Sequence, residues 1–85
     1  MSLNTLAAGE DELLPADYVN RLLNGENALC VYRDLRGMTQ AALAEKAGVN
    51  RVTVAEIETG RKQGSVATLR ALANALGVSL DDLAD

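Results

Sequence analysis

Residues 37–60, GMTQAALAEKAGVNRVTVAEIETG, constrain the fold more than any other part of the chain. Thr39 is a residue type that caps helix N-termini, and the run after it is rich in the helix formers Ala, Leu, Glu and Lys. Gly48 can adopt the left-handed backbone conformation that ends many helices. Asn50 can then cap a second helix that runs to about Thr59. The pattern therefore predicts two short helices joined by a tight turn.

Apolar residues recur at three- and four-residue spacing in both predicted helices, so each helix has one face that can pack. These residues are Leu43, Ala44 and Ala47 in the first helix, Val49 in the turn, and Val54 and Ile57 in the second helix. The small side chains of Ala44 and Ala47 let the two helices cross closely, at the steep angle of a DNA-reading pair. The spacing alone leaves two interpretations open: a helix-turn-helix that binds DNA, or a structural corner turned by glycine.

A short extra helix is expected ahead of this segment, over residues 15–24. Pro15 suits the first turn of a helix, where its missing N–H costs little. The apolar stripe of this helix consists of Tyr18, Val19, Leu22 and Leu23. Two interpretations stay open for the stripe: it packs on the domain, or it faces a partner. Residues 1–14, which include the acidic cluster Glu10-Asp11-Glu12, are expected to form a flexible arm.

Three more helices complete the prediction. One begins at Glu26-Asn27 and runs to about Arg36, one is capped by Ser65 and ends before Gly77, and a short one begins after Ser79. Ser79 and Asp82 have capping-box spacing, with Asp in place of the usual Glu or Gln. The inward residues are Leu29 and Tyr32 with Cys30 or Leu35, then Leu69, Leu72, Ala73 and Leu76, and then Leu80 and Leu83. The chain is therefore predicted to be all-α.

Composition excludes several classes of protein. The chain has 85 residues, which suits one domain with a small core. It has no His and a single Cys, so we expect no disulfide within the chain, no metal site and no cofactor. Cys30 is expected to be a small buried hydrophobe, with a reactive thiol as the alternative. No apolar run approaches the ~20 residues that cross a bilayer, and no signal peptide is visible, so the expected location is the cytoplasm.

The net charge of −4 is unevenly distributed along the chain. Residues 1–30 carry five acids against one base, and residues 65–85 carry three acids against one base. Residues 31–64 carry six bases against four acids, so the positive block coincides with the predicted helix pair. Weak positive charge predicts modest, salt-sensitive affinity of a monomer for DNA, so two copies on one duplex would bind much better.

The residues at fixed register resemble the lambda-repressor-like, or Xre-type, DNA-binding domain. The resemblance rests on Gly37-Met38-Thr39-Gln40, Leu43-Ala44, Ala47-Gly48-Val49, Val54, Ile57-Glu58 and Gly60, with Arg33 before them and Leu69, Leu72, Ala73, Leu76-Gly77-Val78, Leu80 and Leu83 after them. It covers roughly residues 28–84. It implies a five-helix, all-α helix-turn-helix domain over residues 15–85, with the reading unit at 39–59 and the extra N-terminal helix at 15–24.

In this class the N-terminal end of the second motif helix enters the major groove. The outward residues there are Arg51, Val52, Thr53 and Glu56. Arg51 can donate two hydrogen bonds to guanine, Val52 can pack on a thymine methyl group, and Glu56 can accept from cytosine N4. A scattered apolar surface residue is the alternative for Val52.

Other residues are expected on the DNA backbone. They are Gln40, Asn50, Thr59, Arg61 and Lys62, and the resemblance gives Gln40 a phosphate contact. Removing a backbone contact such as Lys62 should weaken binding to all sequences alike. The resemblance also pairs Arg33 with Glu58, as a half-buried ion pair that ties the first core helix to the reading helix. Lys46 and Arg36 are at least as well explained as solvated surface residues.

The resemblance implies a sequence-specific transcriptional repressor that binds palindromic double-stranded DNA as a homodimer. Residues 12–40 are also similar to the lead-in of antitoxins encoded beside RelE/ParE-type toxins, which implies a toxin protein as a second partner. The alternatives are a stand-alone Xre-type repressor and a protein-interaction adaptor on the same fold. An enzyme is not expected, because the chain has no His, no phosphate-binding glycine loop after a strand, and no general base for Cys30 or a serine. We assign no catalytic residue.

Overall fold

The computed structural model describes residues 14–83, and these residues form six α-helices without a strand. The helices are α1 (Ala16–Leu23), α2 (Ala28–Leu35), α3 (Gln40–Ala47), α4 (Arg51–Glu58), α5 (Val66–Leu76) and α6 (Leu80–Leu83). The predicted all-α class and the order of helices are confirmed for this part of the chain. The predicted arm lies outside the described residues, apart from Leu14.

Side chains cap the helices where the sequence places capping residues. Asn27, Thr39 and Ser65 each accept a hydrogen bond from the backbone N–H three residues further on, at 3.1, 3.0 and 3.1 Å. Ser79 and Asp82 form the predicted reciprocal box, since the Ser79 N–H donates to Asp82 at 3.1 Å and the Asp82 N–H donates to Ser79 at 3.3 Å. These contacts satisfy N–H groups that a helix start leaves without partners.

Two N-termini differ from the prediction. Asn50 occupies the N-cap position of α4, but its side chain makes no capping hydrogen bond. Asn50 is exposed, so water can satisfy the N–H groups at the start of α4. Pro15 is the N-cap residue of α1 and precedes its first turn. The turn itself is as predicted, because Gly48 has a φ of +74° and the next N–H, that of Val49, donates to the Ala44 carbonyl at 2.9 Å.

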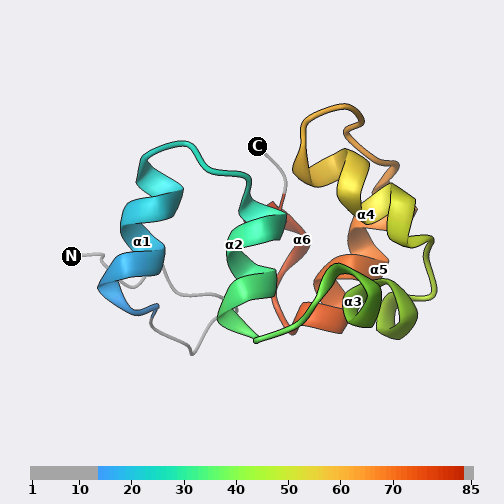
Figure 1. The fold of residues 1–85 in the computed structure, drawn as a ribbon, viewed down its shortest axis with the longest axis horizontal. Coiled ribbons are helices and arrows are strands. Elements are labelled where there is room, and N and C mark those ends of the chain that lie inside the picture. Colours follow the sequence, from blue (N-terminus) through green and yellow to red (C-terminus); the bar gives the residue numbers. More distant parts are fainter. Residues whose placement is uncertain (1–13, 84–85) are drawn as a thin grey trace.

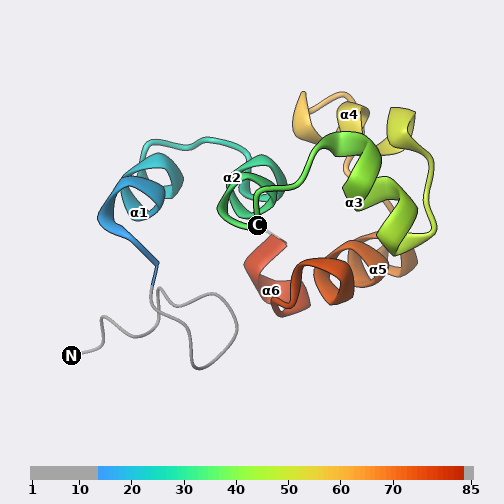
Figure 2. The same cartoon turned by 60° about the horizontal axis from the view of Figure 1, so that its bottom comes forward.

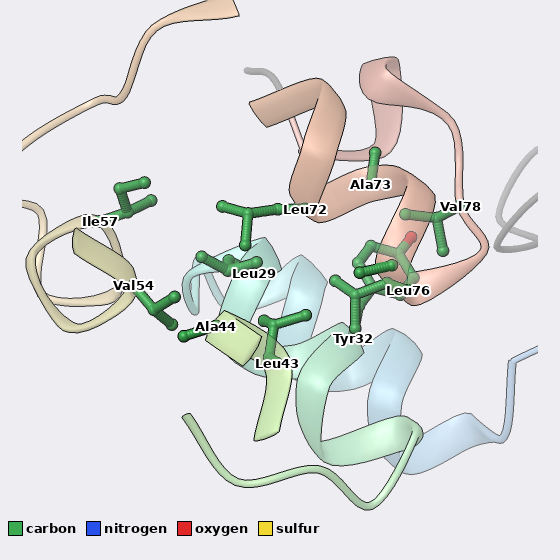
Figure 3. Close-up of a cluster of buried hydrophobic side chains, with 11 residues drawn as sticks. Leu29, Tyr32, Leu43, Ala44, Val54, Ile57, Leu72, Ala73, Leu76 and Val78 are labelled. Carbon is green, nitrogen blue, oxygen red and sulfur yellow. The ribbon is translucent and has the colours of Figure 1, made fainter. Parts of the chain in front are cut away.

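The core lies where α2, α3, α4 and α5 meet (Figure 3). Its buried residues include Leu29, Tyr32, Leu43, Ala44, Val54, Ile57, Leu72, Ala73, Leu76 and Val78. Leu43, Val54 and Leu72 have no exposed surface. α3 packs against both α4 and α5, and α6 packs against α5 and α2 (Figure 2). The small side chain of Ala44 is part of the core cluster.

α1 forms an outer layer on α2, on the side away from α3, α4 and α5 (Figure 1). None of its residues is fully buried; Leu22 is half-buried against the core cluster, whereas Leu23 is 70% exposed. The predicted stripe therefore packs only in part. Val31, which the sequence pattern did not select, has no exposed surface and lies outside the main cluster. It lies two residues, or about 200°, around α2 from Leu29, and so belongs to another face of that helix.

None of the helices within residues 14–83 is long and apolar enough to span a membrane.

Candidate nucleic-acid interface

The N-terminal turn of α4 presents its side chains to solvent. Arg51 is exposed, Val52 is 52% exposed, and Thr53 is half-buried. The opposite side of the same helix is anchored, because Val54 and Ile57 are both in the core. α4 therefore combines a fixed inner face with an open outer face at its N-terminal end.

Three basic side chains around α4 are exposed and have no ion-pair partner among residues 14–83: Lys46, Arg51 and Arg61. Lys46 lies in the last turn of α3, Arg51 begins α4, and Arg61 follows α4. Because no carboxylate within the described residues neutralises them, they make the edges of the helix pair positive. Charges of this kind attract phosphate groups.

Glu56 and Lys62 form an exposed ion pair beside the predicted reading residues. The Lys62 Nζ lies 3.3 Å from Oε1 of Glu56, and the side chains are 58% and 26% exposed, respectively. Glu56 follows Val52 by four residues, so the two side chains lie on the same face of α4. The sequence analysis assigned Glu56 to the base-reading residues and Lys62 to the backbone contacts. In the structure the two side chains form an ion pair.

Thr59 uses its hydroxyl group inside the protein. Its Oγ1 donates back to the carbonyl oxygens of Ala55 and Glu56, at 3.0 and 3.2 Å. A hydroxyl has one hydrogen, and a phosphate oxygen accepts hydrogen bonds only. In this conformation Thr59 is therefore not available as the phosphate donor that the sequence predicted, although it is exposed.

Gln40, at the start of α3, is also held by a contact inside the protein. Its side-chain Nε2 donates to Oε1 of Glu58 at 3.0 Å, and Gln40 is half-buried. An amide nitrogen has two hydrogens, so one stays available for a phosphate. The backbone N–H groups at the start of α3 lie at the same end of the helix and favour negative charge. Gln40, which is the predicted phosphate contact, is therefore hydrogen-bonded to Glu58, the last residue of α4.

Arg33 and Glu58, the pair that the resemblance implied, form a double hydrogen bond. Arg33 Nε donates to Oε2 of Glu58 at 2.7 Å, and Nη2 donates to Oε1 at 3.2 Å. The side chains are 15% and 6% exposed, respectively. Nη1 of Arg33 also donates to the Met38 carbonyl at 2.8 Å, in the turn before α3. The hydrogen bonds from Arg33 to Glu58 raise the pKa of the guanidinium group, so the pair stays charged.

Comparisons with known proteins identify the family of the chain. Residues 32–83 match the sequence model of the helix-turn-helix family. The chain belongs to this family. The matched range covers α3, α4, α5 and α6 and begins inside α2, so α1 lies outside it.

Two curated relatives of this helix-turn-helix chain carry regulatory names. An uncharacterized HTH-type transcriptional regulator of Methanocaldococcus jannaschii is 38% identical over 58 residues, which are 68% of this chain and 88% of that protein. An immunity repressor protein of Bacillus phage phi105 is 46% identical over 48 residues, which are 56% of this chain and 33% of the repressor. No solved structure matches the chain. The family and both names support the prediction that the chain is not an enzyme.

Two side chains hold the helix-turn-helix together in ways that the sequence pattern did not predict. Asn27 caps α2 and also donates from Nδ2 to the Ile57 carbonyl at 3.0 Å, near the end of α4. Arg36 Nε donates to the Leu76 carbonyl at 2.8 Å, at the end of α5. Both contacts join residues far apart in the sequence, and no local pattern identifies such partners. Arg36 is thus half-buried against α5, which differs from the solvated surface residue expected.

Cys30 lies next to the ion pair. It is half-buried, and its Sγ is 3.7 Å from Nη2 of Arg33. Burial raises the pKa of the thiol, and the carboxylates of Glu58 and Asp34 raise it further. Cys30 is therefore a poor nucleophile in this position. Within residues 14–83 no group of three or more His, Cys, Asp and Glu side chains could hold a metal ion.

Proposed function

We propose that this helix-turn-helix chain is a sequence-specific DNA-binding transcriptional repressor that inserts the N-terminal end of α4 into the major groove. The observation that carries the proposal is the exposure of Arg51 and Val52 at the start of a helix whose other face is fixed in the core. Proteins of this class read base edges from that part of the second motif helix. The regulator and repressor names of the two relatives support the same role.

The exposed side chains have the chemistry for reading bases. Arg51 can donate two hydrogen bonds to O6 and N7 of a guanine. Val52 can contact a thymine methyl group, and Glu56 can accept from N4 of a cytosine. Thr53, at the edge of the same face, can reach a base as donor or acceptor. In this proposal the four residues supply the sequence preference.

Phosphate contacts would surround this reading face. Gln40 and the first N–H groups of α3 form one contact region, and Arg61 and Lys62 form another after α4. Asn50, exposed at the N-cap of α4 and free of a capping bond, can turn its amide toward a phosphate. Thr59 belongs to this group only if its hydroxyl leaves the carbonyl groups of α4.

The proposed operator-bound form is a homodimer on a palindromic site, because half-sites one helical turn apart match the two-fold symmetry of such repressors. The proposed dimer surface is α6, where Leu80 is half-buried without being part of the core cluster. Leu83 packs against that cluster, so Leu80 is the better candidate for a contact between subunits. Light scattering of the wild-type chain and of Leu80→Asp tests this surface.

A finer proposal is that the repressor is the autoregulating antitoxin of a toxin–antitoxin pair. It is supported by the similarity of residues 12–40 to antitoxin lead-ins, and by α1 being a layer outside the range that matches the family. Asp17, exposed on α1, and Glu10-Asp11-Glu12, which lie outside the described residues, would suit a basic toxin. Co-purification of the chain with the product of the adjacent gene tests this role.

A gel-shift experiment tests the repressor proposal. The wild-type chain is titrated onto a duplex from the region upstream of its own gene, and onto an unrelated duplex of equal length, at two salt concentrations. A repressor shifts the upstream duplex at lower protein concentration, and the affinity falls as salt rises. The absence of a shift on both duplexes would favour the protein-interaction adaptor, and equal shifts would mean DNA binding without sequence preference.

A further inference from the structure

The loop after α4 folds back onto one turn of the reading helix. The backbone N–H groups of Arg61 and Lys62 both donate to the Glu56 carbonyl, at 2.8 and 3.2 Å. The Thr59 hydroxyl shares its one hydrogen between the Ala55 carbonyl at 3.0 Å and the Glu56 carbonyl at 3.2 Å. These contacts fix the backbone of Lys62 next to Glu56, and the Lys62 Nζ then lies 3.3 Å from Oε1 of the Glu56 carboxylate.

We infer that Lys62 determines base specificity through Glu56: its ammonium group holds the Glu56 carboxylate in the orientation that accepts a hydrogen bond from a base. Lys62 is then a positioning residue as well as a neighbour of the DNA backbone. The inference rests on the proposed function, since it concerns the same α4 surface. It revises the expectation that removing Lys62 weakens binding to all sequences alike.

In a DNA complex, Lys62 would reduce the electrostatic cost of placing the Glu56 carboxylate in the major groove. A carboxylate in the major groove is repelled by the phosphates and loses water when the interface forms. An ammonium group at 3.3 Å offsets both effects. Lys62 lies beside Oε1, and Oε2 of Glu56 has no hydrogen bond or ion pair with any of residues 14–83, so that oxygen can accept from a cytosine amino group.

In the free protein the ion pair between Glu56 and Lys62 contributes little to the stability of the fold. Lys62 is exposed and Glu56 is half-buried, with side chains 58% and 26% exposed, and a pair that is open to water on one side adds little stability to a fold. The contact therefore acts mainly when DNA covers it. This separates a role in specificity from a role in folding, because the first changes sequence preference and the second changes the melting temperature.

Arg61 provides a matched control in the same loop. It is exposed, carries the same charge, and has no ion-pair partner among residues 14–83. A phosphate contact made by Arg61 alone contributes equally to all sequences. Lys62 and Arg61 should therefore differ in their effect on discrimination between bases, even where their effects on total affinity are similar.

The test begins with selection of preferred duplexes from a randomised DNA library by the wild-type chain. Affinities are then measured for the selected duplex and for duplexes with each base pair exchanged. The proteins are the wild type, Lys62→Ala, Lys62→Arg, Arg61→Ala, Glu56→Ala and the double variant Glu56→Ala/Lys62→Ala. Thermal melting of each variant shows whether the fold is intact.

We expect Lys62→Ala to reduce discrimination about tenfold at the base pair where Glu56→Ala also reduces it, which is within the range for coupled neighbours. Lys62→Arg should restore most of that discrimination. In the Glu56→Ala background, Lys62→Ala should lower affinity without changing discrimination further. Arg61→Ala should weaken all duplexes by the same factor.

The inference is overturned if Lys62→Ala weakens all duplexes by one common factor, as Arg61→Ala does. It is also overturned if Glu56→Ala leaves discrimination unchanged at every base pair. Failure of the proposed function gives a different result, because the wild-type chain would then select no preferred duplex from the library.

Discussion

At the scale of single residues, Glu58 is the side chain on which most of the motif depends. It accepts from Arg33 and Gln40, and Arg33 in turn holds the Met38 carbonyl. One carboxylate, 6% exposed, therefore connects α2, the turn before α3, the start of α3 and the end of α4. The resemblance predicted the Arg33–Glu58 pair, whereas the contacts to Met38 and Gln40 depend on positions in space that the sequence pattern does not contain.

Removing this carboxylate should destabilise the fold. Glu58→Ala leaves the half-buried guanidinium group of Arg33 with only the longer, 3.5 Å ion-pair contact to Asp34, and the loss of Glu58 should cost on the order of 3 kcal/mol. Glu45→Ala is the matched control, because Glu45 is exposed on α3. Chemical denaturation should give a clearly lower free energy of unfolding for Glu58→Ala than for Glu45→Ala. Equal and small losses in the two variants would rule out a structural role for the pair.

Cys30 permits a prediction of pH dependence. Burial, followed by the carboxylates of Glu58 and Asp34, raises the pKa of its thiol in the folded chain. The thiolate, which is the reactive form, should then appear at higher pH in the folded chain than in the unfolded chain. Alkylation by iodoacetamide, followed by mass spectrometry across a pH series, should be slower in buffer than in guanidinium chloride. Faster alkylation of the folded chain would mean an activated thiol.

At the scale of elements, the boundaries of the helices could be predicted far better than their packing. Thr39, Gly48, Ser65 and Gly77 mark boundaries through local chemistry, and the structure uses all four. The neighbour of each helix face depends on the tertiary fold. The pattern of α2 identified Leu29 and Tyr32, but it missed Val31, which is fully buried although it lies on another face of α2.

Val31 tests how firmly the face of α2 outside the core cluster is packed. Val31→Ala removes two methyl groups from a position with no exposed surface, and should cost about 2 kcal/mol in the free energy of unfolding. Val66→Ala is the control, since Val66 is 62% exposed and its truncation should change stability by less than about 0.5 kcal/mol. Denaturant titration of both variants checks the difference. Indistinguishable variants would show that this face of α2 is open to water in solution.

At the scale of the whole molecule, the net charge of −4 does not show which basic side chains lack an ion-pair partner. Of the six basic residues in the positive block, Arg33 is paired with Glu58 and Lys62 with Glu56. The composition predicted the location of the block, but only the structure separates paired from unpaired charges. Lys46, Arg51 and Arg61 remain as exposed cations without an ion-pair partner among residues 14–83. A monomer with so few free cations should bind DNA weakly, which is a reason to expect two copies on one operator.

The proposal for the whole molecule depends on α4 entering the major groove by its N-terminal end. The most direct test is to measure the affinities of the wild-type chain and of Arg51→Ala for a selected duplex and for duplexes with single base pairs exchanged. We expect Arg51→Ala to lose about 1–3 kcal/mol of binding free energy and to lose its preference at one base pair, while its melting temperature is unchanged. An Arg51→Ala chain that keeps the full sequence preference of the wild type would contradict the proposal.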